Sequence, residues 1–86
     1  MERRYKSMVR VTGIKRTGAT IEADYFPENE KEAGHIILDR KSGEVVEVKQ
    51  TKMDMGIHTY AAHAASLLRK ILKDEEIPPV MSSVWY

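Results

Sequence analysis

Four apolar runs that alternate or are rich in β-branched residues come before one run with helical spacing. In residues 8–14, Val9 and Val11 share one face of a predicted strand, and polar side chains share the other. Residues 19–25 alternate more strictly, with alanine, isoleucine and tyrosine on one face. The turn between them contains Gly18, which can adopt a positive φ. The pattern therefore predicts a first β-hairpin.

A second predicted hairpin follows an acidic loop. Pro27 ends the preceding strand, because proline cannot donate a hydrogen bond to a sheet ladder. Residues 35–39 and 44–48 are apolar, and the second of these runs is rich in β-branched side chains. The short polar link between them ends at Gly43, the residue expected in the left-handed conformation. Links this short favour an antiparallel meander.

Residues 57–73 carry apolar side chains at helical spacing and predict a helix. Asp54 is the expected N-cap, and Pro78 and Pro79 prevent the helix from continuing. The predicted apolar stripe contains Ile57, Tyr60, Ala61, Ala64, Leu67, Leu68, Ile71 and Leu72. Residues 80–86 are too apolar for a solvated chain end. They predict either a fifth strand at a sheet edge or an intermolecular contact.

These elements predict an α+β fold with the order β-β-β-β-α and a possible C-terminal strand. We expect a four- to five-stranded, mainly antiparallel sheet with one helix packed on one face. Residues 1–86 are expected to form a single α+β domain, whose small core would benefit from burial in a homodimer. The sequence has no apolar run long enough for a membrane span and no signal-type segment, so a cytoplasmic location is expected.

Charge is distributed unevenly along the chain, although the net charge is only +1. Residues 1–20 contain six cationic side chains and one acidic one, whereas residues 21–48 contain eight acidic and three cationic ones. One interpretation is internal, because a basic first strand beside an acidic second strand would be stabilised by pairs of opposite charge. The other is a basic patch for an anionic partner.

Candidate catalytic and metal-binding residues are few. His58 and His63 are five positions apart, which separates them around a helix, whereas zinc-binding helices use a spacing of three or four. Glu22 and Asp24 share one strand face, as a carboxylate pair would, but solvated carboxylates on an outer face have the same pattern. The chain has no cysteine, glycine-rich phosphate loop or active-site serine motif. We therefore expect no enzymatic activity, no cofactor and no metal site.

Two binding functions are compatible with the sequence. An apolar terminal strand can pair with the sheet of another protein or of a second copy, and tryptophan and tyrosine are common at interfaces. The candidate protein-interaction residues are Val80, Met81, Val84, Trp85 and Tyr86. Alternatively, the basic N-terminal strand could bind nucleic acid. The candidate residues for that function are Arg3, Arg4, Tyr5, Lys6, Arg10, Lys15 and Arg16.

Parts of the sequence resemble known proteins. Residues 22–28, residues 34–39, the helix and the terminal Trp85-Tyr86 pair are similar to short bacterial proteins of unknown function, a resemblance that implies no activity. The element order and the sequence of residues 76–79 resemble HicB-type antitoxin domains over roughly residues 19–80. That resemblance implies a partial RNase-H-like fold without catalysis that sequesters a toxin ribonuclease. Residues 38–43 replace the proline- and glycine-bearing motif of that family, so no functional residues carry over.

Overall fold

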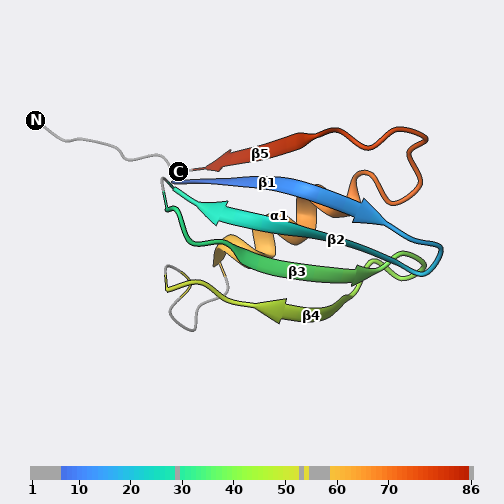
Figure 1. Ribbon diagram of the computed structural model, residues 1–86, viewed down its shortest axis with the longest axis horizontal. Coiled ribbons are helices and arrows are strands. Elements are labelled where there is room, and N and C mark those ends of the chain that lie inside the picture. The colour runs from blue at the N-terminus through green and yellow to red at the C-terminus, as the bar shows by residue number, and fades with distance from the viewer. Residues whose placement is uncertain (1–6, 29, 53, 55–58, 86) are drawn as a thin grey trace, which may run out of the picture.

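A computed structural model describes residues 7–28, 30–52, 54 and 59–85 of the chain. Its elements, in chain order, are β1 (Ser7–Arg16), β2 (Thr20–Pro27), β3 (Gly34–Asp39), β4 (Val45–Lys49), α1 (Thr59–Arg69) and β5 (Val80–Trp85). The five strands form one antiparallel sheet in the order β4-β3-β2-β1-β5 (Figure 1). The α+β fold predicted from the sequence is confirmed, with the tail as the fifth strand.

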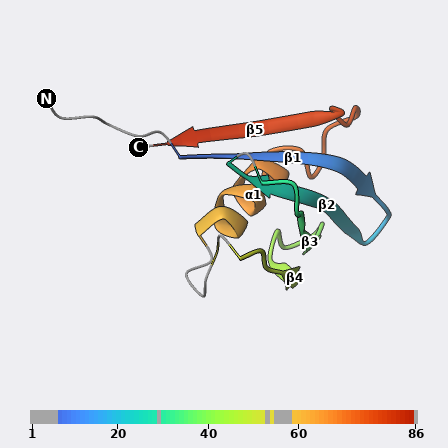
Figure 2. The same ribbon diagram turned by 60° about the vertical axis from the view of Figure 1, so that its left-hand side comes forward.

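The helix connects the two outer strands of the sheet. The chain leaves the meander at β4, crosses one face of the sheet as α1, and returns as β5 beside β1 at the opposite edge (Figure 1). In the turned view, α1 lies on one side of the strands and leaves their other face uncovered (Figure 2). The crossover therefore gives the sheet an inner face against α1 and an outer face without a helix.

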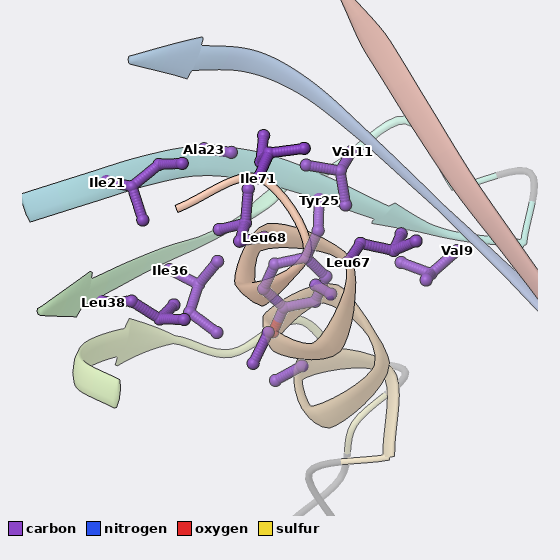
Figure 3. Packing of buried hydrophobic residues seen from close by; sticks show 13 residues of the cluster. Val9, Val11, Ile21, Ala23, Tyr25, Ile36, Leu38, Leu67, Leu68 and Ile71 are labelled. Carbon is purple, nitrogen blue, oxygen red and sulfur yellow. The ribbon is translucent and has the colours of Figure 1, made fainter. Parts of the chain in front are cut away.

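The core lies between α1 and the inner face of the three central strands. Every second residue of β2 and β3 is buried, as period-two alternation requires, and in β1 the same alternation buries Val9 and Val11. Figure 3 shows Leu67 and Leu68 of α1 packed among the side chains of these strands. The buried apolar residues are Val9, Val11, Ile21, Ala23, Tyr25, Ile36, Leu38, Ala61, Ala64, Ala65, Leu67, Leu68 and Ile71. Small alanines on α1 allow the helix to sit close to the sheet.

Helix α1 ends at Arg69, four residues before the predicted end. The amides of Lys70 and Ile71 donate to carbonyls three residues earlier, at 3.1 Å in each case, which tightens the last turn. The following residues form turns and bends, although their apolar spacing continues the predicted stripe. Tertiary contacts with the sheet thus end the helix before its apolar pattern does.

Two arginines, one at the end of β1 and one in the turn after β3, bind carbonyl groups that follow the helix. Arg40 donates from Nε and Nη2 to the Leu72 carbonyl at 3.1 and 3.0 Å, and from Nη1 to the Thr17 carbonyl at 2.6 Å. Arg16 donates from Nη1 to the Ile71 carbonyl at 3.0 Å. Cations are favourable here, because the carbonyl end of a helix carries partial negative charge. These hydrogen bonds connect the segment that follows α1 to the end of β1 and to the turn after β3.

Asp54 is the buried polar centre of the fold. Its Oδ2 accepts hydrogen bonds from Tyr25 Oη at 2.7 Å and from the Thr51 amide and hydroxyl at 3.1 Å each. Its Oδ1 accepts from the Ala61 amide in the first turn of α1 at 3.2 Å. The Asp54 side chain thus accepts a hydrogen bond from an amide in the first turn of the helix, as an N-cap residue does. Helix α1 itself begins five residues later, at Thr59.

The ionised form of Asp54 is stabilised by these donors. Burial by itself raises the pKa of this carboxyl group, but the hydrogen bonds from Tyr25, Thr51 and Ala61 outweigh burial and leave the pKa below its usual value. Burial and the bond to the carboxylate raise the pKa of the Tyr25 hydroxyl. The carboxylate therefore remains charged and the tyrosine neutral over the ordinary pH range.

Gly34 makes room for the tyrosine that reaches this carboxylate. It lies directly opposite Tyr25 in the β2–β3 ladder. A Cβ atom at Gly34 would overlap the ring of Tyr25. The absence of a side chain at position 34 thus lets the ring lie across β3 towards Asp54.

Replacing Asp54 with alanine is expected to lower the free energy of unfolding by about 3 kcal/mol, because several buried donors would lose their charged acceptor. Urea denaturation at pH 7 measures the loss. Because the pKa of Asp54 is lowered on folding, its contribution is present above the unfolded pKa of about 3.9 and is lost as pH falls through the folded value. The matched variant Asp74→Ala, at an exposed position, should change stability by less than about 0.5 kcal/mol.

Candidate functional site

Strand β5 is an outer strand of the sheet. It pairs with β1 over six residue pairs, from Ser7 opposite Trp85 to Thr12 opposite Val80. Within the described sheet, no strand lies on its other side. Backbone N–H and C=O groups along such an edge are a template for a further strand.

The inner face of β5 is anchored in the core. The ring of Trp85 stacks on that of His63, with centroids 3.5 Å apart and planes 9° apart. Tyr60 contacts the same indole in a tilted arrangement at 5.7 Å. Met81 also packs against the core cluster. Of the predicted interaction residues, Met81 and Trp85 therefore face the protein's own helix, which fixes the position of the strand.

The outer face of β5 is apolar and exposed. The exposed fractions of Val80 and Val84 are 49% and 53%, and Ser82 between them is also exposed. The chain carries no charged residue from Ile77 to Trp85. Edge strands are usually protected by lysine, by inward-pointing charge or by proline, and β5 has none of these within its length. Tyr86, the last predicted interaction residue, lies outside the described residues.

The opposite edge, β4, is built differently. Its pairing with β3 shifts register between Ile37 and Leu38, which marks an irregularity of bulge type. It carries Glu47 and Lys49 within five residues. Val46 is 62% exposed, but it lies in this irregular stretch. Charge and a bulge are the usual means of blocking strand addition, so the two edges differ in their capacity to pair.

An apolar hollow of about 270 Å³ lies between α1 and the β4 side of the sheet. It is lined by Ile36, Val45, Val48, Ala61, Ala62, Ala65 and Arg69. Arg69 at this hollow donates from Nε to the Gly43 carbonyl at 2.7 Å, which ties the end of α1 to the β3–β4 turn. The positive φ of Gly43, 77°, places that carbonyl in the turn, as the left-handed glycine predicted there requires.

A charged cluster occupies the outer face of the central strands. His35 Nδ1 lies 2.8 Å from Asp24 Oδ1, and its Nε2 lies 2.6 Å from Glu22 Oε2. The hydrogen bonds to Asp24 and Glu22 raise the pKa of His35, although partial burial opposes them. Protonated, the ring donates from both nitrogens and links β3 to β2. The predicted carboxylate pair thus exists on one strand face, and the histidine bridges it.

This cluster changes the expected role of the basic first strand. β1 does lie beside the acidic β2, and Lys15 is in register with Glu22. Among the described residues, however, the ion pairs of Glu22 and Asp24 are made with His35 and not with cations of β1. Arg10 lies instead over the ring of Phe26, 5.3 Å from its centroid. The two carboxylates of β2 are therefore paired with β3, its other neighbour, and not with β1.

Three of the seven predicted nucleic-acid-binding residues lie in the described structure, all of them on β1. Arg10 stacks on Phe26, Lys15 is exposed, and Arg16 holds the Ile71 carbonyl. The other four candidates, Arg3, Arg4, Tyr5 and Lys6, lie outside the described residues.

The histidines considered as metal ligands are also separated. His63 stacks on Trp85 on the helix side, whereas His35 is held by carboxylates on the outer face. His58 lies outside the described residues. Within the described part of the chain, no group of three or more His, Asp or Glu side chains is arranged to hold a metal ion.

Comparison with protein families, with curated proteins and with solved structures found no match. In residues 7–28, 30–52, 54 and 59–85, no helix has the length and apolarity needed to cross a membrane.

Sequence reasoning missed the bridging of Glu22 and Asp24 by His35. The alternation of residues 19–25 places both carboxylates on one face, but the partner depends on the β2–β3 register, in which Asp24 lies opposite His35. An acidic loop of uncertain length precedes β3 in the sequence, so the pattern did not define that register. The stacking of His63 on Trp85 likewise requires the position of β5.

The pKa of His35 is expected to lie above its ordinary value of about 6.5, and NMR titration of the ring measures it. Because the folded pKa is raised, the stabilisation is fully present below pH 6.5 and is lost as pH rises through the folded pKa. The double variant Glu22→Gln/Asp24→Asn should bring the pKa back towards 6.5 and remove this decline in stability. A wild-type ring that titrates at or below 6.5 would contradict the bridge.

Proposed function

We propose that this chain is a small non-enzymatic interaction module that binds a polypeptide partner by strand addition at β5. The observation that carries the proposal is an uncharged edge strand whose outer face exposes Val80 and Val84. An added strand would satisfy the open backbone groups of β5 and cover both valines. The partner is a second copy of the chain or another protein.

The anchoring of β5 supports this proposal. The stacking of Trp85 on His63 and the packing of Met81 hold the strand in place from the inner face. A strand that is already ordered loses little conformational freedom when a partner pairs with it. The outer residues are thereby free for binding without loss of the core.

The charged cluster supports a binding role better than a catalytic one. Both ring nitrogens of His35 are hydrogen-bonded to carboxylates, so neither is free to accept a proton from a substrate. Glu22 and Asp24 on the outer face would also repel phosphate groups from the surface that Arg10 shares. For this reason we favour a protein partner over nucleic acid.

The test compares immobilised wild-type protein with the double variant Val80→Lys/Val84→Lys in an extract of the source cells to which a second, differently tagged copy of the chain is added. We expect to find a polypeptide that the wild type retains and that the double variant retains at least tenfold less, because lysine on an edge strand opposes the addition of a further strand. Hydrogen exchange of residues 80–85 should slow when that polypeptide is bound.

The matched control is Val46→Lys, which changes an exposed valine at the other edge of the sheet. It should retain the same polypeptide as the wild type. Recovery of identical polypeptides by all three forms would refute binding through β5. A small toxin ribonuclease as the retained polypeptide would support the antitoxin-type role that the HicB resemblance implies.

A further inference from the structure

We propose that the partner at the β5 edge is a second copy of this chain, paired antiparallel in a register centred on Ser82. This inference rests on the proposed function of β5 as a pairing edge. It adds the identity of the partner and the position of the two-fold axis. The joined assembly would be one continuous antiparallel sheet with two β5 strands at its centre.

Symmetry restricts the possible registers. A two-fold axis that makes two β5 strands antiparallel runs perpendicular to the sheet, so outer-face residues of one copy meet outer-face residues of the other. The axis must then pass near a residue paired with its own equivalent. Ser82 and Ser83, at the middle of β5, are the two central choices.

The exposed valines favour Ser82. With the axis at Ser82, Val80 lies opposite Val84 of the partner subunit, and the second valine pair follows by symmetry. Both valines are about half exposed in one copy and cover each other in the pair. With the axis at Ser83, Val84 would lie opposite Ser82 of the partner subunit, and the valines would not meet. The register that buries the exposed apolar surface is therefore the one centred on Ser82.

The inner face is compatible with the same register. Met81 lies opposite Ser83 of the partner subunit, a small side chain. Trp85 keeps its stack on His63 within its own copy. The axis leaves both helices on the same side of the joined sheet. Neither copy has to move its core to form the pair.

Charge does not oppose this pairing. No charged residue lies between Ile77 and Trp85, so the side chains of two β5 strands approach without like-charge repulsion.

The contact is small, because it consists of one short strand against another. Interfaces at the low end of the size range form weak or transient complexes. Self-association is therefore expected at micromolar or higher protein concentrations, as an equilibrium rather than as a permanent dimer.

Sedimentation equilibrium of the full chain from about 10 µM to about 1 mM tests the partner. The wild type should pass from monomer to dimer in this range. Val84→Lys should raise the dimer dissociation constant at least tenfold, because one lysine enters each of the two symmetric valine contacts. Val46→Lys should leave the constant within about twofold of the wild type. Circular dichroism of each variant verifies that it is folded.

Disulfide trapping tests the register, and the absence of native cysteine makes it specific. Residues directly opposite in antiparallel strands have Cα atoms about 4.5–5.5 Å apart, which is within disulfide range. Oxidised Ser82→Cys should form a covalent dimer at least tenfold faster than Ser83→Cys. The exposed helix variant Ser66→Cys serves as a control for random collision.

The possible outcomes distinguish pairing with a second copy from the proposed function of β5, which is strand addition by any polypeptide. Faster trapping of Ser83→Cys than of Ser82→Cys would overturn the register. A wild type that stays monomeric to 1 mM, while another polypeptide still depends on Val80 and Val84 for binding, would overturn the second copy as partner but leave strand addition at β5 in place. Absence of both kinds of binding would overturn the inference and the proposed function together.

Discussion

The buried carboxylate of Asp54 is the interaction on which the arrangement of helix and sheet depends. It joins three parts of the chain that are distant in sequence or separated by turns: the Tyr25 hydroxyl of β2, Thr51 after β4, and the Ala61 amide of α1. A charge at this depth is tolerated because four hydrogen-bond donors are directed at it. The carboxylate therefore fixes where α1 begins relative to the sheet. The arginine bonds at the other end of the helix fix where it ends.

The position of α1 in turn determines which strand becomes the free edge. Because the helix crosses the sheet from the β4 side, the chain after it returns beside β1 and not beside β4. His63 and Tyr60, on the helix face nearest this return, receive Trp85. The last strand is thus held by side-chain packing and by its six pairs with β1. Among the described residues, no strand pairs with its outer edge, and Val80 and Val84 on its outer face are exposed.

The sequence predicted the elements of this fold well, because period-two and helical spacing record which side chains are buried. Val9, Val11, Ile21 and Ala23 all face the core as expected. The predicted end of α1 was wrong. Leu72 continues the apolar spacing, but the helix ends at Arg69, and the Leu72 carbonyl is bound by Arg40.

For the candidate site, alternation placed the two carboxylates on one face, but it could not supply His35, whose position depends on strand register. The sequence shows that residues 80–86 are mostly apolar. Which of them face the core and which are exposed depends on how β5 pairs with β1. The order of residue types therefore predicts which side chains share a strand face, whereas the neighbours across the sheet depend on strand register and long-range contacts.

The two edges of the sheet show how a small protein can limit association to one surface. At β4, charge and a register shift oppose the regular hydrogen bonding of a further strand. At β5, the same protections are absent, and the stacking of Trp85 on His63 holds the strand against α1. Ordering a strand before it binds removes part of the entropy loss that opposes association. An exposed, rigid and uncharged edge would be an aggregation risk if it could extend indefinitely. With β4 protected, the proposed pairing through β5 would occupy the unprotected edge of the described sheet in each copy, so association would close at two.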